Sequence, residues 1–282
     1  KILVIGAGPS GMESARLLAM RGHHVEVWEK EKDIGGTVRI AALAYEPNER
    51  LINYLKNSLT ELGIKIKMGT LATAKLIESF NPDHVIVAVG ANRDAPSIKG
   101  KDKKHVFDGE QLRGLLFGSD DNAIKKLSLF QQIILKIGRA SQLLRNISIL
   151  RFLSKLWMPI SKNIVVIGGD LVGLELAEFL IERGRNVKVL EPSGSLGPNL
   201  SIVRRSRVVH LLREHGADLL TNVDIKEIRD KEVIFHHEEV EKTLKADQVI
   251  IALGANSNLI LSKSINGLDI PITSIGDCTS VG

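Results

Sequence analysis

The segment ILVIGAGPSG, residues 2–11, decides the fold, because an apolar run stops abruptly at a glycine-rich turn. The run predicts a buried strand, and the apolar periodicity of the following MESARLLAMRG predicts an amphipathic helix. In such a turn, Gly6 permits the tight bend, Gly8 lets the backbone approach a pyrophosphate, and Gly11 lets the helix pack on the strand. A second strand, HVEVWEK, then ends near Glu29, where an acid can bind ribose hydroxyls. The sequence therefore opens on a β-α-β unit that is expected to bind a dinucleotide.

Residues 164–192 match residues 2–30 element for element: strand, glycine-rich turn, helix, strand and a final acid, Glu191. Such self-similarity indicates an internal repeat of one supersecondary unit. The second turn departs from the first at Asp170, which occupies the place of a glycine next to the expected pyrophosphate. As an N-cap, the Asp170 carboxylate could accept the N–H groups that a phosphate would use and so weaken nucleotide binding. Alternatively, this side chain points outward and leaves the site open.

Two features favour a working NADH site in the second repeat. Glu191 keeps the acid that can bind ribose hydroxyls, and no Arg or Lys follows within EPSGSLG to hold a 2′-phosphate. NADH is therefore expected, and NADPH is less favoured. The alternative is a degenerate, non-catalytic domain that binds ADP or FAD for structure only.

The composition is that of an ordinary globular protein with room for two domains: 282 residues, 44% of them apolar and 25% charged. Cys278 is the only cysteine, which excludes a disulfide, a CxxC redox pair and a multi-cysteine iron–sulfur site inside this chain. No apolar run reaches the length of a membrane span and no signal peptide is recognised, so the cytoplasm is the expected location. Because Lys1 opens directly on a strand and Gly282 follows IGDCTSV, we expect a piece of a larger protein.

The order of the elements predicts an α/β fold with two doubly wound, Rossmann-like domains, the second inserted in the first. We expect a discontinuous first domain of residues 1–115 and 256–282, a basic helical insertion of residues 116–162, and a second domain of residues 163–255. Residues 122–162 hold eight Lys and Arg and no Asp or Glu. Packing at a domain interface is the favoured role of this basic stretch, ahead of an acidic partner such as a CoA tail or contact with an anionic membrane surface.

Four segments in a fixed order, VIGAGPSG, EKEKDIGG, VIVAVGA and SIGDCTSVG, resemble the FAD-binding signature of the glutathione-reductase-like flavoproteins with two dinucleotide-binding domains. More narrowly, the chain resembles the carboxy-terminal half of the old-yellow-enzyme-like multidomain reductases: 2,4-dienoyl-CoA reductase, 2-enoate reductase and trimethylamine dehydrogenase. The resemblance implies an oxidoreductase that passes electrons from NADH to FAD. It also implies an amino-terminal barrel of the same polypeptide, absent here, that holds FMN, a 4Fe-4S cluster and a small-molecule substrate. That substrate would be an activated alkene such as an enoyl-CoA or a 2-enoate.

The resemblance also implies the residues that would hold each nucleotide. FAD is expected at Gly6, Gly8, Pro9, Ser10, Gly11, Glu29, Lys30, Gly36, Thr37, Ala88, Val89, Gly90 and Asp277. NADH is expected at Gly168, Gly169, Asp170, Leu171, Val172, Glu191, Ala252 and Gly254. Two positions depart from the family pattern: Val89 stands where Thr is frequent, and Thr37 stands where Gln is frequent.

No catalytic side chain is predicted, because hydride transfer between a nicotinamide and a flavin requires positioning rather than a protein acid or base. The histidine pairs at 23–24 and 236–237 lack further ligands at metal spacing, so no metal site is predicted. Arg39 follows the Gly35–Gly36 turn and could approach the flavin or the absent barrel, but an ordinary surface residue is the favoured interpretation. No nucleic-acid-binding module is recognised in the chain.

Overall fold

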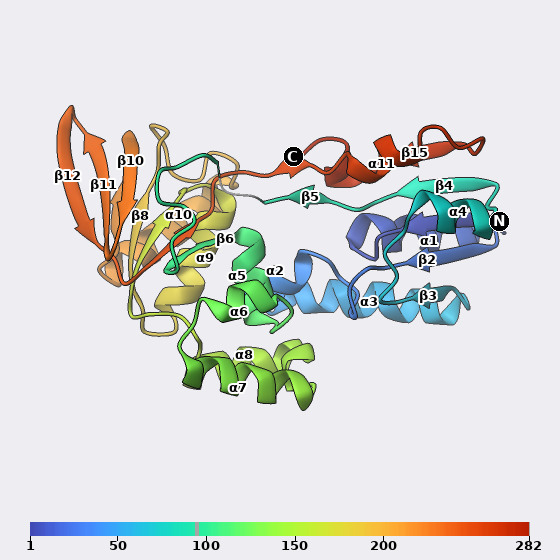
Figure 1. Ribbon diagram of the computed structural model, residues 1–282, viewed down its shortest axis with the longest axis horizontal. Coiled ribbons are helices and arrows are strands. Elements are labelled where there is room, and N and C mark those ends of the chain that lie inside the picture. Colours follow the sequence, from blue (N-terminus) through green and yellow to red (C-terminus); the bar gives the residue numbers. More distant parts are fainter. Residues whose placement is uncertain (94–95, 282) are drawn as a thin grey trace. The chain divides into compact units, whose positions relative to one another are not determined.

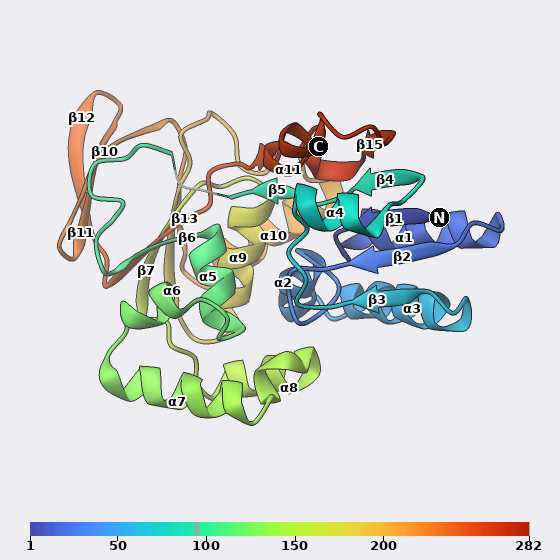
Figure 2. The ribbon, with the colours of Figure 1, turned by 45° about the vertical axis from the view of Figure 1, so that its right-hand side comes forward.

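The computed structural model describes residues 1–93 and 96–281, and the chain forms two compact units (Figure 1). The first unit combines Lys1–Asn92 with Ala255–Gly282, and the second consists of Arg93–Gly254. Each unit contains a parallel sheet with helices packed against it, which Figures 1 and 2 show from two directions. The predicted α/β class with Rossmann-like nucleotide-binding domains is confirmed.

The first unit takes its secondary structure from both ends of the chain. Its elements are β1 (Ile2–Ile5), α1 (Pro9–Met20), β2 (Val25–Trp28), α2 (Val38–Ala44), α3 (Pro47–Glu61), β3 (Lys65–Lys67), α4 (Ala74–Phe80), β4 (His84–Val87), β5 (Ala91–Asn92), β14 (Asn256–Ser257), α11 (Ile260–Ile265), β15 (Ile272–Ser274) and the 3-10 turn η2 (Gly276–Cys278). Five strands form one parallel sheet in the order β15-β4-β1-β2-β3. The central strand β1 is buried along its whole length, as expected for a parallel strand that helices cover on both faces.

The second unit contains a parallel sheet, an antiparallel sheet and the helices of the basic stretch. Its elements are β6 (Val106–Asp108), α5 (Gly109–Leu116), α6 (Asp121–Lys125), α7 (Leu129–Ala140), the 3-10 turn η1 (Leu143–Arg145), α8 (Ile147–Leu156), β7 (Asn163–Ile167), α9 (Leu171–Ile181), β8 (Asn186–Leu190), α10 (Ile202–Glu214), β9 (Asp218–Leu220), β10 (Val223–Arg229), β11 (Glu232–His237), β12 (Val240–Lys245) and β13 (Gln248–Ile251). The parallel sheet has the order β6-β13-β7-β8-β9, and β10, β11 and β12 form the antiparallel sheet. Side chains of both sheets, among them Val165, Ile251 and Phe235, share one core.

The two parallel sheets repeat the same strand order. In the first unit β4-β1-β2-β3 are neighbours, and in the second β13-β7-β8-β9 take the same places. The fifth strand is recruited differently, since β15 pairs with β4 whereas β6 pairs with β13. The internal repeat seen in the sequence is therefore a repeat of four strands, with α1 and α9 in the same place after the first strand. The last connection differs, because β3 reaches β4 through α4 whereas β9 reaches β13 through β10, β11 and β12.

The boundary of the first unit differs from the predicted one. Residues 93–115 were expected in the first domain, but β6 pairs in parallel with β13 through Val106 and Val249, which places this segment in the second unit. The pairing partner β13 lies far along the chain, and the three residues of β6 do not indicate which sheet the strand joins. The basic stretch also belongs to the second unit, as α6, α7, η1 and α8.

Candidate nucleotide-binding sites

The turn between β1 and α1 is shaped by steric contacts that only glycine permits at two positions. Gly6 has φ 105°, and a Cβ on it would lie 2.3 Å from the Ala88 carbonyl oxygen. A Cβ on Gly11 would lie 1.9 Å from the Gly6 oxygen. By contrast, a Cβ on Gly8 would meet nothing within 4 Å. The outer glycines therefore build the turn, whereas Gly8 leaves open space in front of it.

Helix α1 presents unpaired donors to that open space. It begins at Pro9, which has no N–H, and the first amide bonded back to the turn is that of Met12, which donates to Gly8 O at 2.9 Å. Within residues 1–93 and 96–281, the amides of Ser10 and Gly11 have no hydrogen-bond partner. A helix N-terminus with free N–H groups and the positive end of its dipole is suited to a phosphate.

Glu29 ties this turn to the end of β2. One carboxylate oxygen accepts the Ala7 N–H at 2.6 Å, and the other accepts the Glu31 N–H at 2.9 Å. The side chain is buried, so these two bonds fix its position. Each carboxylate oxygen has a second lone pair that can accept a hydroxyl, which is the role expected for a ribose-binding acid.

The structure brings most of the other predicted FAD residues to the same turn. A Cβ on Gly36 would lie 3.1 Å from the Gly8 Cα, and a Cβ on Gly276 would lie 2.5 Å from Ser10 Oγ. Three distant segments thus converge: the turn itself, residues 35–37, and the segment that carries Asp277. Ala88, Val89 and Gly90 follow β4 beside Gly6, whereas Lys30 is exposed at the end of β2 and Thr37 begins α2 without a side-chain capping bond.

The second turn reproduces the first in detail. Gly168 has φ 109° and a Cβ on it would lie 2.4 Å from Ala252 O, while a Cβ on Gly173 would lie 1.9 Å from Gly168 O. The buried Glu191 accepts the Gly169 N–H at 2.5 Å and the Ser193 N–H at 2.7 Å. Gly254 follows Ala252 with a left-handed φ of 65°.

Asp170 is turned away from the helix that it precedes. It is the N-cap of α9, with φ −89° and ψ −164°, yet its side chain makes no bond to that helix. Its carboxylate instead accepts Asn199 Nδ2–H at 2.6 Å and the Asn199 backbone N–H at 3.2 Å. The amides of Leu171 and Val172 have no partner in the described part of the chain. Of the two alternatives left open by the sequence, the structure has the outward side chain.

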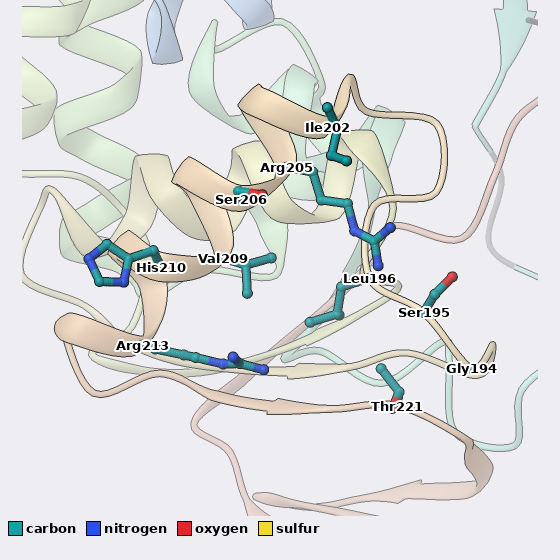
Figure 3. Close-up of a pocket in the computed structure, with 10 residues that line it drawn as sticks. All are labelled: Gly194, Ser195, Leu196, Ile202, Arg205, Ser206, Val209, His210, Arg213 and Thr221. Carbon is teal, nitrogen blue, oxygen red and sulfur yellow. The ribbon is translucent and has the colours of Figure 1, made fainter.

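A pocket of about 580 Å³ lies beside this second turn, within the second unit (Figure 3). The loop after Glu191, helix α10 and the end of β9 contribute its walls, which consist of Gly194, Ser195, Leu196, Ile202, Arg205, Ser206, Val209, His210, Arg213 and Thr221. His210 pairs with Glu214 at 3.2 Å, whereas the guanidinium groups of Arg205 and Arg213 make no ion pair or hydrogen bond with any described residue. The pocket is therefore cationic.

Sequence reasoning missed these arginines and Asn199. The segment EPSGSLG holds no cation, but the fold brings Arg205 and Arg213 to its side from the next helix. The run RRSR at 204–207 was the only available signal. The interpretation of Arg39 as a surface residue was wrong, because Arg39 is buried and forms an ion pair with Asp33 at 3.1 Å.

The single cysteine has a structural role. The Cys278 thiol is buried and donates to the Val87 and Ile275 carbonyl oxygens at 3.1 and 3.0 Å. The described residues contain no group of three or more His, Cys, Asp or Glu side chains placed to hold a metal ion.

Comparison with known proteins identifies the family. Residues 1–276 match the pyridine nucleotide-disulphide oxidoreductase family. The chain belongs to this family. Its membership indicates a flavin-dependent oxidoreductase that binds FAD and NAD(H), which is consistent with the two turns described above. Despite the family's name, a cysteine pair for disulphide exchange is not available within a chain whose only cysteine is Cys278.

The similar proteins are longer than this chain. A bilirubin reductase of Mediterraneibacter gnavus is 31% identical over 280 residues, which cover 99% of this chain and 37% of that protein. An NADH oxidase of Thermoanaerobacter brockii is 27% identical over 288 residues, covering 100% of this chain and 38% of that protein. A solved 2-naphthoyl-CoA reductase complex is 30% identical with a TM-score of 0.80, and the match covers 37% of its chain. The resemblance to one half of the multidomain reductases is thereby confirmed, and the chain spans less than two-fifths of each of these three proteins.

Proposed function

We propose that the chain is the electron-entry part of a larger reductase, with FAD in the first unit and NADH in the second. The observation that carries this proposal is the doubled turn. Each copy combines two sterically required glycines, a helix N-terminus with unpaired amides and a buried acid held by backbone N–H groups. A single turn of this kind would supply one nucleotide site, whereas two allow a donor and an acceptor on one chain.

The residues of the first unit fit a flavin dinucleotide. The amides of Ser10 and Gly11 would donate to its pyrophosphate, and the missing Cβ of Gly8 leaves room for the phosphate oxygens. Glu29 would accept ribose hydroxyls, and Asp277 lies in the segment that rests on the same helix end. FAD, when bound, supplies the capacity to accept a hydride and to pass electrons on.

The residues of the second unit fit NADH in the same way. The amides of Leu171 and Val172 would donate to the pyrophosphate, and Glu191 would accept ribose hydroxyls. Asp170 leaves these donors free because Asn199 holds its carboxylate. This arrangement supports a working site over the alternative of a non-catalytic domain. No side chain is assigned to acid–base catalysis.

We further propose that the electrons leave toward a barrel with FMN and an iron–sulfur cluster, where an activated alkene is reduced. The support is the set of similar proteins, which include a bilirubin reductase, a cinnamate reductase and a 2-naphthoyl-CoA reductase. One buried cysteine cannot hold such a cluster, so its ligands would come from outside these 282 residues.

The test is the absorbance of the purified chain, followed by rapid anaerobic mixing with NADH. We expect the oxidised-flavin band at about 450 nm, and we expect NADH to bleach it. A colourless chain that gains no colour with added FAD would refute the first site. A yellow chain that millimolar NADH leaves unbleached would refute electron entry and support the non-catalytic alternative.

A further inference from the structure

Helices α7 and α8 turn their apolar faces outward. Figures 1 and 2 show them as neighbours, with α5 and α6 between them and the sheet of the second unit. The exposed side chains are Phe130, Ile133 and Ile137 on α7, and Ile149, Phe152 and Leu156 on α8. A surface helix of a globular protein ordinarily directs its apolar stripe at the core. Here the stripe lies on the opposite side.

The same spacing occurs on both helices. Each set of three follows the pattern i, i+3, i+7, which places its members on one helix face. The inward sides are anchored separately, through the buried Leu135 on α7 and the buried Leu150 on α8. The exposed residues are therefore not needed to attach these helices to the unit.

Local sequence encodes both helices independently of that outer face. Ser128 and Gln131 form a capping box at the start of α7, and the Asn146 side chain caps α8 by accepting the Ile149 N–H at 3.0 Å. These helices have defined starts, and the outward face is presented by folded structure rather than by a frayed segment.

Positive charge borders the apolar face on both helices. Lys136 and Lys155 stand six residues after the first member of each set, at the edge of the stripe, and neither makes an ion pair with any described residue. Residues 122–162 hold eight Lys and Arg and no acid. The surface therefore combines apolar side chains, unpaired lysines and Trp157, whose amphipathic ring suits an interface between water and an apolar phase.

We propose that this outward face of α7 and α8 is a docking surface for an anionic lipid bilayer. The helices would lie in the plane of the interface, with the apolar side chains in the headgroup–acyl boundary and the lysines against lipid phosphates. In the described ranges, no helix combines the length and the apolar character needed to cross a membrane.

Charge separates this occupant from a second copy of the chain. A two-fold symmetric dimer brings the same patch of both copies together, so Lys136 and Lys155 would face their own like charges. An anionic bilayer supplies phosphates for the lysines and an apolar layer for the stripe at once. A soluble protein surface, whether of a partner or of another domain of a longer polypeptide, would need to be equally apolar and to have an acidic border. The proposal does not depend on the function proposed above.

The experiment is co-sedimentation of the full chain with phosphatidylcholine vesicles, with and without phosphatidylglycerol. We expect binding to the anionic vesicles only, weakened by high salt. The double variant Phe130→Ser/Ile133→Ser should lose at least about tenfold in binding. Each of Lys136→Gln and Lys155→Gln should lose about fivefold.

The matched control is Leu71→Ser/Val240→Ser, which changes two side chains of similar exposure elsewhere: 67% and 57%, against 69% and 56% for Phe130 and Ile133. The control should bind vesicles as the unsubstituted chain does. Circular dichroism checks that every variant is folded. Equal binding to neutral vesicles, no binding to either kind, or equal losses in the control pair would overturn the proposal. A dimer in sedimentation equilibrium that Phe130→Ser/Ile133→Ser dissociates would assign the face to a second copy and overturn it as well.

Discussion

Asn199 should control the affinity of the second site for NADH although it lies outside the glycine-rich turn. In the structure it holds the Asp170 carboxylate through two hydrogen bonds. Asn199→Ala removes the shorter of them, and the carboxylate can then rotate toward the unpaired amides of Leu171 and Val172. We expect Asn199→Ala to raise KM for NADH and Kd for NAD⁺, measured by dye-linked NADH oxidation and by calorimetry.

The size of the effect follows from two competing interactions. A carboxylate that capped α9 would gain about 1 kcal/mol from its hydrogen bonds to the helix. A phosphate that used the same amides would have to displace this carboxylate. If the carboxylate and a phosphate lay about 5 Å apart, their repulsion at an effective dielectric constant of about 20 would be about 3 kcal/mol. Asp170 is half-exposed, so solvent screens part of that repulsion. We therefore expect a loss of 1 to 3 kcal/mol, roughly fivefold to 150-fold in Kd.

The variant Asp170→Gly removes the carboxylate to which this loss is attributed. Without the carboxylate, NADH should bind at least as tightly as in the unsubstituted chain, and adding Asn199→Ala should change nothing further. The control is Asn186→Ala, which removes a surface amide bond of 2.8 Å to Asn163 at the other end of β8. If Asn199→Ala weakened NADH binding equally in the Asp170→Gly background, the Asp170 side chain would not be the cause.

Four further outcomes follow from the same structure. Gly11→Ala should cost about 3 kcal/mol or more and abolish flavin binding, because its Cβ meets a backbone oxygen at 1.9 Å. Gly8→Ala should leave the unfolding temperature unchanged and weaken FAD binding. The control Gly267→Ala, whose Cβ would also lie in open space, should change neither the unfolding temperature nor FAD binding. A Gly8→Ala chain that binds FAD normally would contradict the proposed phosphate position. Burial raises the pKa of Glu175, so the folded chain keeps this proton to higher pH than the unfolded chain and stability falls as the pH rises above 4.5. Glu175→Gln should therefore raise Tm at neutral pH, with the gain fading as the pH falls toward 4.5; a constant gain at all pH values rules out the titration. Arg205→Ala should lower kcat/KM for NADPH about fivefold and leave that for NADH unchanged, because only NADPH carries an extra phosphate for the unpaired guanidinium; equal losses for both substrates would place Arg205 on a shared group.

The turns could be predicted from sequence because their requirements are local. Gly6 and Gly11 face backbone atoms a few residues away or on the adjoining strand, so glycine is needed whatever the rest of the chain does. The acids Glu29 and Glu191 are fixed by N–H groups of the same two loops. Because these requirements are local, the repeat can be recognised from a single sequence.

The remainder depends on partners that spacing does not reveal. The Asp170 side chain could cap its helix or turn away from it. It turns away because it accepts a hydrogen bond from Asn199, which lies across a loop of irregular structure. Arg205 reaches the pocket from a helix that begins after that loop. The strand β6 joins the parallel sheet of the second unit by pairing with β13, and no residue near β6 in the sequence indicates this pairing. In each case the deciding contact is non-local and involves side chains or edges with several possible partners.

The split first unit has a consequence for how the chain matures on the ribosome. Strand β4 lies between β1 and β15, but β15 is made only after the whole of the second unit has been synthesised. For a time on the order of ten seconds or more at ordinary elongation rates, β4 has a bare edge that could recruit a wrong strand. The inserted unit, Arg93–Gly254, is contiguous and can close first. The first unit, which we propose to bind FAD, would then be the last to fold, and newly made chains would bind the flavin only after translation has passed β15.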